Sequence, residues 1–167
     1  MTRLWKENGF VENDAWVLPV EGEPVAEGAK VIYGFEEFLA AAEASNESGF
    51  GVLVKPADDV TKLGPYLDRI SLVAVAFPAF NDGRGFSHAS LLRSRLAFDG
   101  EVRAVGDVLI DQVPLMLRCG FDSFAVTNPT AIRRLEEKRL PGISLHYQPA
   151  TRASKGNERF SWRRKAS

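Results

Sequence analysis

From Lys30 onward, the sequence alternates short runs rich in β-branched and aromatic residues with stretches of helical hydrophobic periodicity. This alternation is typical of βα units, in which parallel strands are joined by right-handed helical crossovers. The predicted strands are 30–33, 50–54, 71–77, 101–105, 121–126 and 143–147. Six strands with five intervening helices predict an α/β fold with a mainly parallel sheet.

Each predicted helix has one apolar face, such as Phe35, Phe38, Leu39 and Ala42 at spacing i, i+3, i+4, i+7. Pro114 interrupts the amphipathic helix predicted at 107–118 and should either kink it or remove one backbone hydrogen bond. The predicted helix caps are Asp59, Ser87, Gly106 and Asn128, the last followed by Pro129 at the first helical position.

Two short apolar runs flank Asn8-Gly9, a pair that favours a type I′ turn, and so predict an N-terminal β-hairpin. We expect one α/β domain over 1–150, with the hairpin and a connecting loop in 1–29 and βα repeats in 30–150. The repeats form either an open sheet or a partial TIM-like barrel, because a closed barrel typically needs about 250 residues. The hairpin or a second subunit, in a homodimer, would cover the open edge.

The composition fits a soluble protein: of 167 residues, 45% are hydrophobic, and the formal net charge is -1. A single cysteine excludes an internal disulfide. Because no apolar run reaches the roughly 18 residues of a membrane span and the first residues lack a signal sequence, we expect a cytoplasmic location without membrane contact.

The C-terminal segment 151–167 is strongly basic. Positions 152–167 hold six Lys or Arg and one acid, which leaves 15 basic and 21 acidic residues in positions 1–151. With few apolar residues, this tail is predicted to be flexible. It is either a solubilising end or an electrostatic hook for an acidic partner or RNA, with Trp162 as a stacking group. We favour the solubilising end, and nucleic acid is not the expected partner.

In a βα sheet, ligands bind where strands end and helices begin, so the segments that follow the predicted strands are expected to share one rim. The most informative of them is NDGRGFS at 81–87. Two glycines around an arginine, just before a helix, are typical of an anion site. Gly83, Arg84, Gly85 and Ser87 are its predicted ligands. Alternatively, this is a structural turn in which Arg84 pairs with Asp82 or Asp107. A dinucleotide fingerprint is disfavoured because His88 occupies the third glycine position.

Arg103 lies within a predicted strand, where a charge requires partners; Asp107, Asp82 and Glu101 are the candidates. The resulting network is either structural or a further anion-binding clamp. His146, near the end of the last predicted strand, is the best-placed general acid or base. The candidate catalytic residues are therefore Arg84, Arg103, Asp107 and His146.

Redox and metal chemistry have little support in the residues themselves. Cys119 precedes Gly120, a natural helix C-cap, so it lies at the negative end of a helix dipole and is predicted to be inert. The two histidines and one cysteine show no spacing of metal ligands.

Several motifs resemble a bacterial family of unknown function. The resemblance spans roughly 1–148 and is carried by Phe77, Phe80, Asp82 to Ser87, Leu91 to Arg93, Gly100, Val102 to Leu109, Asp111-Gln112, Arg118 to Asp122 and Tyr147-Gln148. The sequence departs from the family pattern at Ile110, at Pro114 and in the basic tail.

Genes of that family usually neighbour assimilatory sulfite reductase, and its members are commonly described as probable oxidoreductases of sulfite reduction. The resemblance thus implies an accessory protein or oxidoreductase of this pathway, with sulfite reductase as partner. Because six-electron reduction needs a cofactor, an oxidoreductase would require a bound flavin or a partner that carries the cofactor. The alternatives are a non-catalytic assembly module for the reductase and a small hydrolase- or lyase-like enzyme that uses His146.

Overall fold

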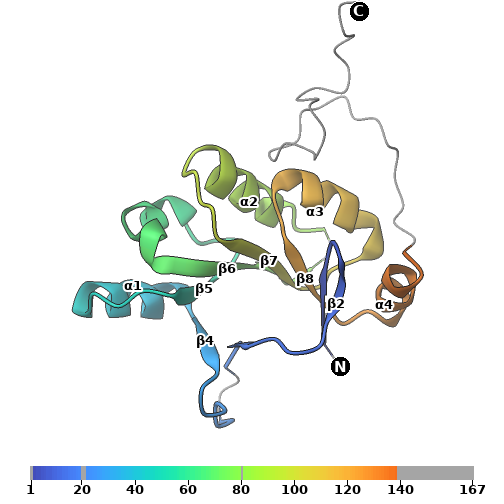
Figure 1. Ribbon diagram of the computed structural model, residues 1–167. Helices are drawn as coiled ribbons and strands as arrows, with labels where there is room; N and C mark the ends of the chain where they lie inside the picture. The colour runs from blue at the N-terminus through green and yellow to red at the C-terminus, as the bar shows by residue number, and fades with distance from the viewer. Residues whose placement is uncertain (1, 20–21, 80, 139–167) are drawn as a thin grey trace, which may run out of the picture.

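The computed structural model describes residues 2–19, 22–79 and 81–138 (Figure 1). Its strands are β1 (Arg3–Lys6), β2 (Gly9–Val11), β3 (Trp16–Val17), β4 (Lys30–Tyr33), β5 (Phe50–Val54), β6 (Ile70–Phe77), β7 (Glu101–Gly106) and β8 (Ser123–Val126). Its α-helices are α1 (Phe35–Ala44), α2 (Arg84–Ser94), α3 (Val113–Cys119) and α4 (Pro129–Glu136), and its 3-10 helices are η1 (Val60–Arg69) and η2 (Ile110–Gln112). The described chain is therefore α/β, as predicted.

The eight strands form one sheet in the order β2-β1-β8-β7-β6-β5-β4-β3, which curls as a half-barrel. Neighbouring strands from β3 to β8 pair in parallel, whereas β1 pairs antiparallel with both β2 and β8. The prediction of a mainly parallel sheet is therefore corrected to a mixed sheet. The physical reason is the N-terminal hairpin, which extends the sheet beyond β8 and so covers an edge that βα units alone would leave open.

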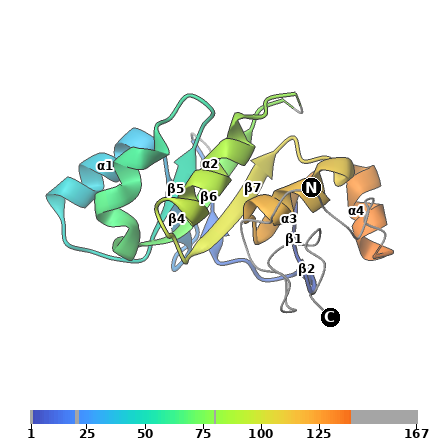
Figure 2. The ribbon, with the colours of Figure 1, turned by 90° about the horizontal axis from the view of Figure 1, so that it is seen from above.

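The helices gather on one face of the sheet, as the two ribbon views show (Figures 1 and 2). Side chains that alternate along the central strands, among them Val73, Val75, Val102 and Ala104, join these helices in the main hydrophobic core. The other, concave face has a smaller buried cluster of Ile32, Leu72 and Ala74, with Trp16, Leu53 and Val105 packed against it. The strands therefore present two chemically different faces.

Two of the predicted helix caps are confirmed. The side chain of Asp59 accepts a hydrogen bond from the Thr61 N–H, and that of Asn128 accepts from the Thr130 and Ala131 N–H groups. The prediction for Ser87 is wrong, because α2 begins three residues earlier at Arg84.

The stretch 107–118 does not form one kinked helix. The 3-10 helix η2 comes first, and α3 begins at Val113, which places Pro114 in its first turn. Because N–H groups in the first turn have no intrahelical acceptor, proline is tolerated there. Gly106, predicted as a cap, instead ends β7 with a φ of 97°.

The predicted strand 143–147, His146 and the basic tail 151–167 lie outside the described residues. In the described part, no helix is both long enough and apolar enough to cross a membrane.

Candidate functional site

The carboxyl ends of the central parallel strands form a rim that includes three of the predicted segments. The Asp107 N–H donates to the Phe77 carbonyl over 2.7 Å, which joins the ends of β7 and β6. The His88 Nε2 lies 3.2 Å from the Pro56 carbonyl and joins α2 to the segment after β5. The expectation that these loops meet is therefore confirmed for the segments after β5, β6 and β7.

Arg84 stands at this rim and is held by the loop that carries it. Its Nε and Nη2 donate to the two carboxylate oxygens of Asp82 over 3.0 and 2.8 Å, and its backbone N–H also donates to Asp82. These hydrogen bonds lower the pKa of the Asp82 carboxyl below its ordinary value. The pairing with Asp82 is one of those that the structural-turn interpretation predicted, yet the Arg84 side chain remains 62% exposed.

The two glycines beside Arg84 have different roles. Gly83 is exposed and has open space where a Cβ would lie. Gly85 is buried, and a Cβ there would stand 2.6 Å from ring carbons of Phe77. Gly85 thus permits close packing of α2 on β6. Ser87, the remaining predicted ligand, is exposed in the first turn of α2.

Arg103 lies away from the rim. In register, it stands beside Ala74 of β6 and Ser123 of β8, three residues before β7 ends, which is roughly 10 Å along a strand. Its neighbours Val102 and Ala104 face the helices, so its own side chain points to the concave face. The structure therefore brings Arg84 and Asp107 to one rim and does not bring Arg103 there.

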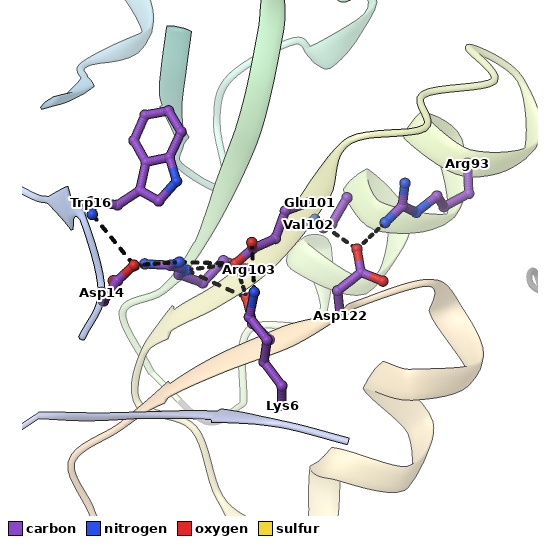
Figure 3. Close-up of polar contacts among 9 residues, drawn as sticks. Lys6, Asp14, Trp16, Arg93, Glu101, Val102, Arg103 and Asp122 are labelled. Atoms are coloured by element: carbon purple, nitrogen blue, oxygen red, sulfur yellow. Dashed lines mark hydrogen bonds and ion pairs between the residues drawn. The ribbon is translucent and has the colours of Figure 1, made fainter. Parts of the chain in front are cut away.

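On the concave face, Arg103 is the centre of a polar network (Figure 3). Its side chain is 4% exposed and pairs with Asp14 and Glu101. Glu101 also accepts hydrogen bonds from the Ser123 hydroxyl over 2.6 Å and from the Lys6 ammonium over 3.0 Å. The negative charges of two carboxylates in this network thus balance the positive charges of one ammonium and one guanidinium.

Glu101 remains ionised in these surroundings. Burial alone would raise the pKa of its carboxyl, but the hydrogen bonds from Ser123, Lys6 and Arg103 outweigh burial. The pKa of Glu101 therefore lies below its ordinary value.

A second arginine with a buried side chain, Arg93 of α2, joins the two loops that lead into β7 and β8, at the amino ends of these strands. Its Nη1 donates to the Phe98 and Gly100 carbonyls over 2.6 and 2.7 Å, and its Nε donates to the Gly120 carbonyl over 3.0 Å. Its Nη2 pairs with Asp122, which also accepts the Val102 N–H (Figure 3). We call Arg93 and these partners the arginine lock, and its role is structural because it holds the two loops together.

Cys119 is half-buried, and burial raises the pKa of its thiol against smaller opposing effects of Ser90 and Arg118. A raised pKa keeps the thiol protonated near neutral pH, as the prediction of an inert cysteine requires. Among residues 2–19, 22–79 and 81–138, no three His, Cys, Asp or Glu side chains are grouped so that they could hold a metal ion.

Sequence reasoning missed Asp14 and Arg93. Asp14 meets Arg103 across 89 positions, and a lone acid in a polar loop gives no sequence signal of such a contact. Arg93 and Asp122 both lie in motifs on which the family resemblance depends. Their opposite charges were the sequence feature from which an ion pair between these motifs could have been predicted.

The model of one protein family, described as "Bacterial protein of unknown function (DUF934)", matches residues 51–157, more than half of the chain. The chain belongs to this family. The DUF934 match covers the Arg84 loop, the arginine lock and the two central residues of the concave network, Glu101 and Arg103. No match was found among curated proteins or among solved structures.

Proposed function

We propose that this protein is an accessory protein of assimilatory sulfite reduction that docks on sulfite reductase through the rim around Arg84. The pathway is inferred from the family resemblance, because genes of that family usually neighbour the reductase. The docking role depends on one observation: the Arg84 guanidinium is exposed and yet held in one orientation by Asp82.

A guanidinium fixed before binding loses little side-chain entropy when a partner binds, and arginine is frequent among the residues that dominate interface energies. Within the described residues, no hydrogen bond involves the Arg84 Nη1, so this nitrogen can meet an acidic group of the partner or an oxyanion. Asp107, at the same rim, makes its contact through the backbone and leaves its carboxylate as a second polar group.

The direct test is an affinity measurement between the purified protein and its neighbouring reductase. Arg84→Ala is expected to weaken binding about tenfold or more, the loss typical of an interface hot spot. Asp82→Asn should weaken it less, because the guanidinium is kept but its orientation is loosened. Arg95→Ala is the matched control, because Arg95 is exposed at the other end of the same helix.

Equal binding by wild type and Arg84→Ala would exclude the docking rim. The pathway is tested separately: a deletion strain should grow poorly on sulfate as sole sulfur source, and unimpaired growth would exclude the pathway. The ultraviolet–visible spectrum of the native protein, with and without the reductase, tests for an oxidoreductase role. If the spectrum shows flavin absorbance, the protein takes part in electron transfer and its role is not purely accessory.

A further inference from the structure

The guanidinium of Arg103 has two edges with different surroundings. The inner edge is fixed by the sheet: Nε and Nη2 donate to Glu101 over 3.1 and 2.9 Å, and Nε lies 3.4 Å from the Ser123 hydroxyl. Both partners are the first residues of their strands. The orientation of the Arg103 guanidinium is thus set by residues of β7 and β8.

The outer edge meets a single acid from an irregular segment. Nη1 and Nη2 donate to the two oxygens of Asp14 over 2.5 and 3.2 Å (Figure 3). Asp14 belongs to residues 12–15, which are all exposed and contain no helix or strand; we call this segment the strap. Within the described chain, the only side chain of another element that the strap pairs with is Arg103. Its other hydrogen bonds to neighbouring elements come from backbone N–H groups: that of Trp16 donates to the Asp14 carboxylate, and that of Lys30 donates to the Ala15 carbonyl over 2.8 Å, so the strap is anchored at its Ala15 end.

The charge balance of the network indicates which kind of ligand could bind at the outer edge of Arg103. With Asp14 in place, two carboxylates balance Lys6 and Arg103. Without Asp14, one positive charge remains on a side chain that is 4% exposed. Two parallel N–H donors in one plane match an anion that presents two oxygens, such as a carboxylate or a sulfur oxyanion.

We propose that the outer edge of Arg103 is an oxyanion-binding site and that Asp14 is its internal, displaceable occupant. An external oxyanion takes the two hydrogen bonds of Asp14, and the strap then leaves the concave face. The site is separate from the rim at Arg84, so this proposal does not depend on docking to the reductase.

Displacement of the strap affects the residue that follows it. The Trp16 N–H donates to Asp14 over 3.3 Å, and the Trp16 ring covers Gly51, where a Cβ would stand 2.6 Å from the ring. The ring also packs on the buried cluster of Ile32, Leu72 and Ala74. Movement of the strap would therefore change the environment of Trp16, and its fluorescence reports binding.

The experiment compares wild type with Asp14→Ala and with Glu12→Ala, a neighbouring exposed acid of the strap that serves as control. Sodium acetate, sulfate and sulfite are titrated against sodium chloride at matched ionic strength, with the thermal midpoint as readout. Acetate or a sulfur oxyanion should stabilise Asp14→Ala saturably, beyond chloride. Whichever anion gives the lower half-saturation shows whether the site prefers carboxylates or sulfur oxyanions. No difference from chloride in Asp14→Ala would overturn the proposal.

Only the wild type shows whether an anion can displace Asp14. In Asp14→Ala the outer edge of Arg103 is vacant even if Asp14 never leaves it in the wild type. Since the strap competes, the wild type should bind about 10- to 100-fold more weakly than Asp14→Ala. Its Trp16 emission, taken as the difference from Trp16→Phe, should shift over the same anion range. If the wild-type Trp16 emission is still unchanged at an anion concentration about a hundredfold above the half-saturation concentration of Asp14→Ala, the proposal is overturned. Glu12→Ala should titrate like the wild type, and a response like that of Asp14→Ala would also contradict it.

Discussion

Replacing Arg93 by methionine should destabilise the protein strongly, although the residue lies in a motif that a sequence comparison would take as functional. Methionine fills a similar volume but supplies no donors. The change removes the hydrogen bonds to the Phe98, Gly100 and Gly120 carbonyls and the ion pair with Asp122. Two of those carbonyls belong to buried residues, so water cannot fully replace the lost donors.

The magnitude follows from these contacts. Leaving a buried acceptor without a donor costs about 1–3 kcal/mol. Breaking a buried ion pair by removing one partner costs about 3–5 kcal/mol in total. The contacts share one guanidinium and are not additive, so we expect a loss of about 3–5 kcal/mol in the free energy of unfolding. A domain of ordinary stability, about 5–15 kcal/mol, would then be close to its limit.

Urea denaturation followed by circular dichroism measures this loss. Arg95→Ala, on the same helix and exposed, is the control and should change stability by no more than about 0.5 kcal/mol. Arg93→Lys should lie between the control and Arg93→Met, because an ammonium can replace only some of the donors of the planar fork. A loss below about 1 kcal/mol for Arg93→Met would refute the structural assignment of this arginine.

Three further outcomes are expected. Gly85→Ala should cost about 1–3 kcal/mol because its Cβ meets Phe77, whereas Gly83→Ala should be nearly neutral; equal effects in urea denaturation would contradict this difference. Alkylation of Cys119 by iodoacetamide should be slow at pH 7 and still accelerate above pH 9, since burial raises the thiol pKa from 9.0; a rate that levels off below pH 8 would oppose this expectation. Because folding lowers the pKa of Glu101 from its ordinary value of 4.5, its carboxylate stabilises the fold above that pH, and this stability is lost as the pH falls through the lower, folded value. Glu101→Gln should therefore flatten the acid limb of the stability profile, and an unchanged slope would count against the network.

Local patterns predicted much of the fold. The strands at 30–33 and 50–54 have the predicted bounds, and the N-terminal hairpin is present, because each depends on periodicity or turn chemistry within a few residues. The predicted type I′ turn at Asn8-Gly9 is wrong: Glu7 and Asn8 form the turn, and Gly9, with a φ of 128°, is the first residue of β2. The single 107–118 helix was wrong because proline at a helix start and proline in a helix interior differ only in where the helix begins.

The candidate site was predictable only where the interacting residues are close in sequence. The Asp82–Arg84 pair lies within one loop, so proximity in sequence favoured it, and Glu101 was among the partners predicted for Arg103. The division of the arginines between a rim and a concave face was not predictable, because it depends on which side of the curled sheet each strand residue faces.

The sequence by itself determined the alternation of strands and helices, the helix caps Asp59 and Asn128, and the presence of cationic groups that need partners. Only the tertiary structure decided which partners they have. Asp14 reaches Arg103 because the hairpin pairs with β8 and carries the following strap across the concave face. Contacts of this kind join residues far apart in the chain, and their free energy depends on burial and geometry that exist only after the sheet has formed.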